Sequence, residues 1–187
     1  MTISPSPDDA GKELRAFRYR KDALRELEKA AKGMGIPVNQ LVNDCVVEGL
    51  IHITLRRGAQ AMTLSRQSVV KILSLIENID EIIRVGGEVG DSLPMQLYAV
   101  HDVEPSWDSV LFALDQVHGK SCGWFEFKYH SHYDRTGKEL HRLIFIHDAG
   151  IRWTAFIEGY ITKMLKRLLK VESKVIAATD TMLEVVV

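Results

Sequence analysis

The sequence predicts an α+β protein with an N-terminal strand–helix–helix unit, a linking helix and a C-terminal domain that mixes strands and helices. Residues 14–20 alternate with the period of a strand, and two stretches with helical apolar spacing follow them. Beyond residue 92, strand and helix patterns succeed each other. The expected parts are a disordered arm over 1–11, the first unit over 12–57, the linking helix over 62–88 and the mixed domain over 92–187.

The composition is that of an ordinary globular protein. The 187 residues are 46% hydrophobic and 26% charged, with a formal net charge of −1. No apolar run is long enough to span a bilayer, and the first residues lack the apolar core of a signal peptide. The two cysteines therefore indicate reduced thiols. We expect a cytoplasmic protein without a membrane partner.

The predicted first strand has two different faces. Phe17 and Tyr19 point to one side, whereas Leu14, Ala16 and Arg18 point to the other, because side chains alternate along a strand. One face is therefore aromatic and the other is small or tipped with a guanidinium group. A strand this short needs a partner, so the pattern favours a two-stranded ribbon shared by two chains.

Two helices are expected after this strand. The first carries apolar residues at spacings of three and four, and Gly33 and Gly35 end it because glycine adopts the left-handed conformation without strain. Pro37 suits the first turn of the second helix. The apolar stripe of that second helix is Leu41, Val42, Cys45, Val46 and Leu50.

The order of elements over residues 12–55 resembles the ribbon-helix-helix family of repressors. The resemblance rests on the Phe17-Arg18-Tyr19 strand, on the spacing to Leu27 and on the turn over 35–41. It implies a dimer whose ribbon enters the major groove of DNA and a second helix whose first N–H groups bind phosphate. The DNA-contacting residues that it implies are Leu14, Ala16, Arg18, Arg20, Lys21, Val38 and Asn39.

The distribution of charge agrees with this interpretation. Residues 11–57 contain ten Lys or Arg and six acids, whereas 58–187 contain 14 basic and 17 acidic residues. A basic segment is the electrostatic footprint that DNA binding needs. The predicted function is a homodimeric transcriptional repressor that binds double-stranded DNA, with a higher oligomer left open. The alternatives are an antitoxin or other partner-binding module, and a DNA-organising or segregation protein with weak sequence preference. A short dimerisation module or a helical hairpin, without a DNA role, also fits.

The rest of the chain is expected to begin with a helix over 64–85, capped by Ser65 and stopped by Gly86 and Gly87. The elements expected after it are a strand over 93–103, a helix over 106–117, a hairpin of strands over 124–133 and 140–147, a helix from 150, and strands over 175–178 and 182–187. This β-α-β-β-α-β order is the ferredoxin-like pattern. In architecture it resembles the nickel-responsive repressors, so we expect the domain to bind an effector, oligomerise or bind a partner protein.

The hairpin carries candidate metal ligands. His130 and His132 share one face of a strand, and a turn that pairs 133 with 138 places His141 on that face as well. Three imidazoles bind borderline metals such as zinc or nickel, and Cys122 or His118 lies near enough in sequence to supply a fourth ligand. The alternative is an exposed polar sheet face. Apart from this transition metal, no cofactor is expected.

Catalysis is not expected. His147-Asp148 suggests acid–base chemistry, but Asp148 also suits a turn or helix cap, and no phosphate-binding loop or nucleophile motif accompanies the pair. The alternating aromatic residues of 124–133 fit two uses, either packing in a core or lining a small-ligand pocket. The sequence leaves both open.

Overall fold

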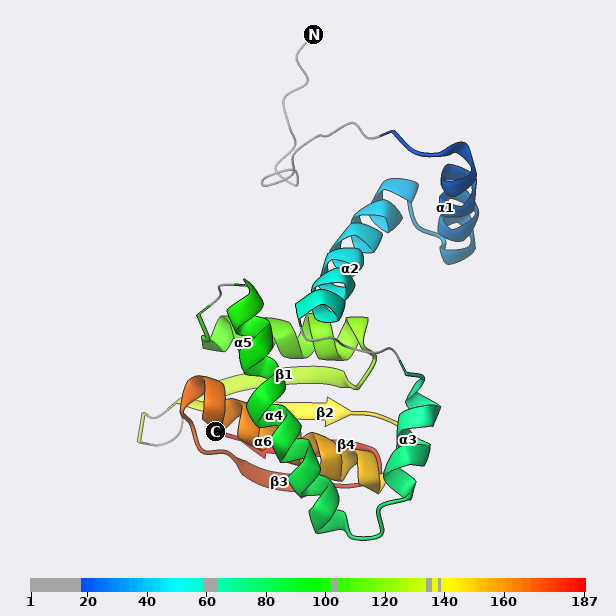
Figure 1. Ribbon diagram of the computed structural model, residues 1–187. Helices are drawn as coiled ribbons and strands as arrows, with labels where there is room; N and C mark the ends of the chain where they lie inside the picture. Colours follow the sequence, from blue (N-terminus) through cyan, green and yellow to red (C-terminus); the bar gives the residue numbers. More distant parts are fainter. Residues whose placement is uncertain (1–17, 59–63, 102–103, 134–135, 138) are drawn as a thin grey trace. The chain divides into compact units, whose positions relative to one another are not determined.

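The computed structural model describes residues 18–58, 64–101, 104–133, 136–137 and 139–187 (Figure 1). The chain divides into two compact units, Met1–Val47 and Glu48–Val187. No helix in the described part of the chain is long and apolar enough to cross a membrane.

The first unit contains helix α1, Lys21–Met34, and the beginning of α2, Val38–Gly58. Gly35 ends α1 with a left-handed φ of 68°, and the N–H of Ile36 donates to the carbonyl of Ala31 at 3.1 Å. The methyl group of Ala31 is buried, 1% exposed. The two predicted helices and the glycine between them are confirmed.

The predicted ribbon strand is not shown. Its residues 14–17 lie outside the described part, and Arg18, Tyr19 and Arg20 are not in a strand. Arg20 instead occupies the position before α1 with extended dihedral angles, φ −65° and ψ 141°. Its guanidinium donates to the carboxylate of Asp22 in the first turn.

The second unit is built on a four-stranded antiparallel sheet in the order β1-β2-β4-β3, which confirms the α+β class. The strands are β1, Glu126–Tyr133; β2, Glu139–Ile146; β3, Lys174–Ala178; and β4, Met182–Val186. The predicted hairpin, its turn with Gly137 at φ 83°, and the two last strands are confirmed.

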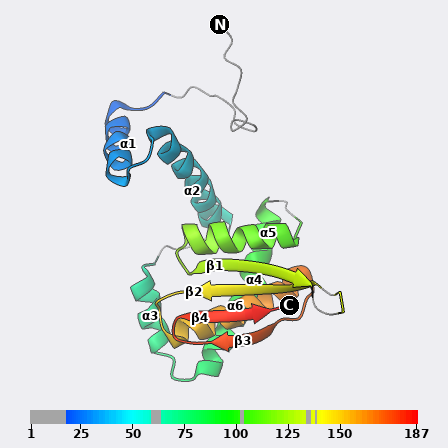
Figure 2. The same cartoon turned by 180° about the vertical axis from the view of Figure 1, so that it is seen from behind.

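Two long helices lie on one side of this sheet: α4, Ile79–His101, and α6, Ile151–Leu169. Figures 1 and 2 show α6 between the sheet and α4, and Figure 2 shows the other face of the sheet toward the viewer. Helix α6 is accordingly buried on several sides rather than along one stripe. The buried residues of α6 and of the sheet belong to one hydrophobic core, which includes Leu143, Phe145, Ile157, Tyr160, Ile161, Leu165, Leu183 and Val185.

The expected ferredoxin-like order is wrong because residues 93–101 continue helix α4 instead of forming a strand. Gly86 and Gly87, expected to stop the preceding helix, lie inside α4, as does Gly90. A Cβ atom at Gly86 would lie 2.2 Å from the carbonyl oxygen of Phe156, and one at Gly90 would lie 2.2 Å from that of Tyr160. These glycines therefore permit close contact between α4 and α6.

Helix α3, Arg66–Ser74, is separate from α4, and Ser65 caps it as predicted, accepting a hydrogen bond from the N–H of Ser68 at 3.2 Å. Helix α5, Trp107–Phe112, begins at Ser106 in a capping box. It continues without a break into a π-helix, η2, Ala113–Ser121. The predicted end of this helix at residue 117 is therefore about one turn early. π-Helical segments are rare and frequently occur at functional sites.

Candidate functional site

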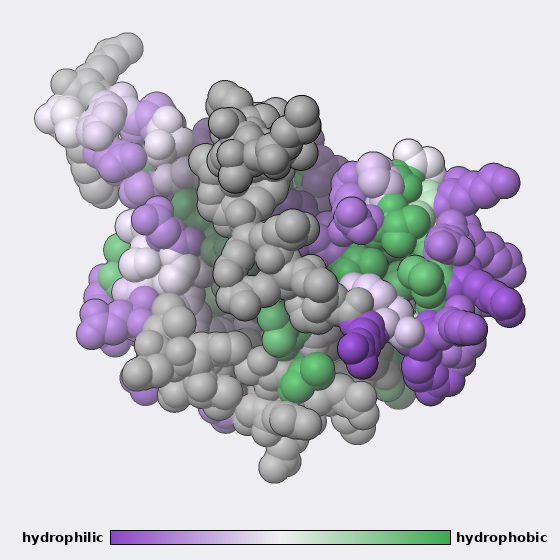
Figure 3. Space-filling model, turned by 90° about the horizontal axis from the view of Figure 1, so that it is seen from above, coloured by the Kyte–Doolittle hydropathy of each residue, from purple (hydrophilic) through white to green (hydrophobic). Residues whose placement is uncertain are grey.

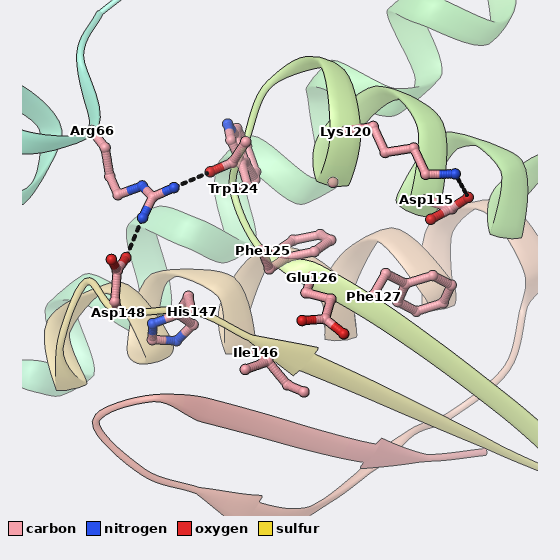
Figure 4. A pocket seen from close by; sticks show the side chains of 12 residues that line it. Arg66, Asp115, Lys120, Trp124, Phe125, Glu126, Phe127, Ile146, His147 and Asp148 are labelled. Atoms are coloured by element: carbon pink, nitrogen blue, oxygen red, sulfur yellow. Dashed lines mark hydrogen bonds and ion pairs between the residues drawn. The ribbon is translucent and has the colours of Figure 1, made fainter. Parts of the chain in front are cut away.

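Two adjoining pockets lie between η2 and the first half of β1, and together we call them the β1 groove. The first has a volume of about 710 Å³ and the second of about 430 Å³. Asp115 and Phe127 line both. Figure 4 shows the first pocket, with η2 above it and the ends of β1 and β2 below. The second pocket continues along β1 to Tyr129, and Phe112 of α5 lines its other side.

The groove has an aromatic floor supplied by alternate residues of the chain entering β1. Phe125 is buried and its ring lies 4.8 Å from that of Phe145, measured between centroids. The ring of Phe127 lies 5.3 Å from the same Phe145 ring. Because strand residues alternate, Phe125, Phe127 and Tyr129 all face the side of the sheet that carries the helices. This packing against the core fixes the floor.

Charged groups close one end of the groove. Arg66, the first residue of α3, pairs with Asp148 after β2. The same guanidinium donates to the carbonyl oxygen of Gly123 at 3.2 Å, a contact that Figure 4 draws. Three segments distant in sequence are thus joined at this rim. Asp148 does not cap α6 as expected, since Gly150 precedes that helix without a side-chain cap.

A second ion pair lies where the two pockets meet. The Lys120 ammonium lies 2.8 Å from a carboxylate oxygen of Asp115, and the Gln116 amide donates to the same carboxylate at 2.5 Å. All three residues belong to η2, so its π-helical spacing sets their position. The polar rim is therefore held by bonds within the protein.

A buried hydrogen-bonded pair supports η2 from behind. His118 is 5% exposed, and its Nδ1 lies 2.9 Å from the carbonyl oxygen of Ala113, which can only accept. Nε2 must then accept the hydrogen of the Tyr160 hydroxyl, 2.7 Å away. Burial lowers the pKa of His118 and raises that of Tyr160. This neutral pair anchors the helix that carries the groove to α6.

His147 is engaged in a similar way. Its Nδ1 accepts from the N–H of Ala149 at 3.2 Å, so its Nε2 donates to the hydroxyl of Thr154 at 3.1 Å. The Thr154 hydroxyl donates onward to the carbonyl oxygen of Thr179 at 2.5 Å. Burial lowers the pKa of His147. Both ring nitrogens are occupied, which offers no support for acid–base chemistry by the His147-Asp148 pair.

These two histidines predict a loss of stability in mild acid. Their pKa values in the folded protein lie below the unfolded value of about 6.5, so the unfolded chain binds protons first. Stability is full above pH 6.5 and falls as the pH drops from there toward the folded-state pKa values. Urea unfolding at pH 7.5 and pH 5.5 measures this loss. We expect His147→Gln to reduce the loss of stability between the two pH values. The control is His130→Gln, at an exposed position, which should show the same loss as the unaltered protein.

The hairpin register separates the three histidines proposed as metal ligands. Ser131 pairs with His141, so His141 lies on the opposite face from His130 and His132. A shift of one residue from the register assumed above moves a side chain to the other face. Nδ1 of His141 lies 2.7 Å from the Tyr129 hydroxyl. Within the described ranges, no three His, Cys, Asp or Glu side chains form a group that could hold a metal ion.

The residues proposed to contact DNA are not gathered on a ribbon. Leu14 and Ala16 lie outside the described part, and Arg18, Arg20, Lys21 and Asn39 are exposed on the first unit. Val38, half-buried, begins α2. Apolar side chains are exposed on α1 and α2 as well, and Figure 3 shows hydrophobic surface among hydrophilic side chains on the face it draws. The exposed apolar residues of the two helices include Leu24, Met34, Val46 and Val47.

No protein-family model matches this sequence, and no curated protein matches it. Among solved structures, the chain is similar to a trafficking protein particle complex subunit 3 from Naegleria fowleri covalently bound to palmitic acid. The two share 11% sequence identity over 74% of this chain and 92% of that chain, with a TM-score of 0.42. A likeness this distant assigns neither a fold nor a function.

The predicted membership of the ribbon-helix-helix family is wrong. No protein-family model matches the sequence, and Arg18–Arg20 form no strand in the described part. The function derived from that resemblance, a DNA-binding transcriptional repressor, is wrong with it, as are double-stranded DNA as the partner and the homodimer built on a shared ribbon. The β1 groove, which sequence reasoning did not assemble, replaces the ribbon as the candidate site.

Proposed function

We propose that this protein is a binding module whose β1 groove takes an elongated, mainly apolar ligand. The observation that carries the proposal is the pair of adjoining pockets with an aromatic floor and a polar rim of fixed ion pairs. Small-ligand sites are typically clefts of roughly 300–1,000 Å³ with apolar walls and a few placed polar groups. The first pocket, at about 710 Å³, falls in this range.

Binding without catalysis fits the polar groups at the groove. The guanidinium of Arg66 and the ammonium of Lys120 are each paired with a carboxylate, and His147 uses both ring nitrogens in the fold. A general base needs a free nitrogen or oxygen within reach of the substrate proton. We therefore propose a non-enzymatic role. A cytoplasmic location is part of the same proposal and rests on two free thiols, Cys45 and Cys122.

Phe112 offers the sharpest test because it lines the second pocket and is 57% exposed, so its loss changes the groove more than the core. We expect Phe112→Ala to weaken binding of Nile red, an uncharged dye that fluoresces in apolar surroundings, by about fivefold, since roughly half of an aromatic contact is lost. The matched control is Ile176→Ala on β3, where the side chain is 52% exposed. Equal dye affinity of both variants and the unaltered protein contradicts the proposal.

A further inference from the structure

Strand β1 is an edge of the sheet, and its outer side faces the groove. The sheet order leaves β1 and β3 as the two edges. Strand β3 has five residues and a register irregularity between Val175 and Ala177, whereas β1 has eight residues in continuous register with β2. Short length and bulges are devices that protect edges from pairing with another chain. Strand β3 has them and β1 does not.

The hydrogen bonds of β2 show which backbone groups of β1 point outward. The N–H of His141 donates to the carbonyl of Val187 at 3.0 Å, and the N–H of Val187 donates back at 2.9 Å. His141 therefore directs its backbone toward β4, and its neighbours Leu140 and Arg142 direct theirs toward β1, because these groups alternate along an antiparallel strand. The residues of β1 whose backbone N–H and C=O groups form hydrogen bonds with β2 are then Glu126, Lys128, His130 and His132.

The remaining residues of β1 present their N–H and C=O groups to the free edge. They are Phe127, Tyr129, Ser131 and Tyr133. In the described part of the chain, no backbone hydrogen bond joins these outward groups to another segment. Phe127 and Tyr129 also line the groove, so two of the residues with outward backbone groups belong to its wall.

The pockets repeat with the spacing of a strand. The first is lined by Phe125 and Phe127, and the second by Phe127 and Tyr129, so the second lies two residues further along β1. Two residues of a strand span roughly 6.6–6.8 Å, the distance between side chains on one face of an extended peptide. A strand paired with β1 would thus place its residues i and i+2 in successive pockets.

We propose that the ligand of the β1 groove is an extended segment of a partner polypeptide that adds a strand to the free edge of β1. The proposal rests on the proposed function and specifies the ligand. Main-chain hydrogen bonds would provide affinity and the two pockets would select apolar residues at alternate positions. The acids that line the groove are each paired with a base, Asp115 with Lys120, Asp148 with Arg66 and Glu126 with Lys128, so the apolar pockets provide the selectivity.

An array of synthetic octapeptides tests the proposal on the full chain. In each peptide, valine or leucine alternates with threonine and lysine, and fluorescence polarisation measures binding. We expect a subset to bind, and to bind more weakly when glycine replaces the valine or leucine residues. N-methylation of single peptide amides is then decisive. Strand addition predicts that affinity falls at every second amide, because alternate amides face β1. Equal loss at all positions, or at none, overturns the proposal.

Ser131→Pro tests the same hydrogen bonds from the protein side. Proline removes an outward N–H without touching the β1–β2 ladder, and proline is tolerated at such edge positions. One lost hydrogen bond predicts peptide binding weaker by about three- to tenfold. Ser131→Thr keeps the N–H and is expected to bind like the unaltered protein. Thermal unfolding of both variants confirms that the fold is retained.

The outcomes separate this inference from the proposed function. If Nile red binds through Phe112 but no peptide does, strand addition is wrong and the apolar groove remains. If neither dye nor peptide binds, both are wrong. If Ser131→Pro alters self-association of the protein and no peptide binds, a second copy of this chain is the partner and the inference is again overturned.

Discussion

Gly159→Ala is expected to lower the free energy of unfolding by about 3 kcal/mol, the upper part of the range for overpacked sites. A Cβ atom at this position would lie 1.9 Å from the carbonyl oxygen of Ile83 and 2.8 Å from the backbone nitrogen of Gly87. Both neighbours are backbone atoms of α4, so no side chain can rotate away. Relief requires α4 and α6 to separate, which would loosen the core on both sides of α6.

Gly49→Ala is the control for this prediction. Gly49 lies in α2, and a Cβ atom there would meet nothing within 4 Å. Alanine is a better helix former than glycine by about 0.8–1.0 kcal/mol, so this variant should be as stable as the original or slightly more so. Urea unfolding followed by circular dichroism measures both. If Gly159→Ala is no less stable than Gly49→Ala, the close contact between α4 and α6 is wrong.

Tyr160→Phe is expected to lower the free energy of unfolding by about 1–3 kcal/mol, although it removes only one oxygen atom. The lost hydroxyl donates to Nε2 of His118 inside the protein, at 2.7 Å, and nothing replaces it when the ring alone remains. His118 then keeps a buried acceptor without a donor. Because His118 anchors η2 to α6, the change should also weaken Nile red binding in the groove.

Tyr133→Phe removes the same hydroxyl from a tyrosine that is 71% exposed, and it should change stability by less than about 0.5 kcal/mol. Urea unfolding at pH 7.5, where both histidines are neutral, compares the two variants. Equal stability of Tyr160→Phe and Tyr133→Phe would show that the buried pair contributes nothing.

The second half of the fold followed from local patterns because each element carries its own signal. The alternation over 124–133, the turn around Gly137 and the long apolar helix after Gly150 all predicted their elements correctly. The helix end predicted at Gly86 and Gly87 was wrong, because the sequence does not distinguish a glycine that ends a helix from one that allows a second helix to pack closely. Only the contact with α6 distinguishes the two uses, and that contact is distant along the chain.

The N-terminal interpretation failed for a different reason. Two helices joined through Gly35 and Pro37 were predicted correctly, but a glycine–proline turn between amphipathic helices is compatible with many helical units. Period-two alternation over seven residues is too short to establish a strand. An excess of basic charge does not identify DNA as the partner, because solvent-exposed helices carry such charge too.

The candidate site was predictable in part. The aromatic alternation of 124–133 left open a core or a pocket, and the residues serve both: Phe125 packs in the core and Phe127 lines the groove. Arg66 could not have been assigned, because it meets Gly123 from 57 residues away. The pairing of Asp115 with Lys120 depends on a π-helix, for which sequence gives no simple period.

The most direct test of the central claim is a map of where an apolar ligand binds. Amide chemical shifts of the ¹⁵N-labelled protein, followed during titration with indole, report this residue by residue. The β1 groove predicts that the largest changes occur at Gly119, Lys120, Phe127 and Tyr129, which line it. Changes centred instead on the opposite face of the sheet, at Met182, Glu184 and Val186, would contradict it.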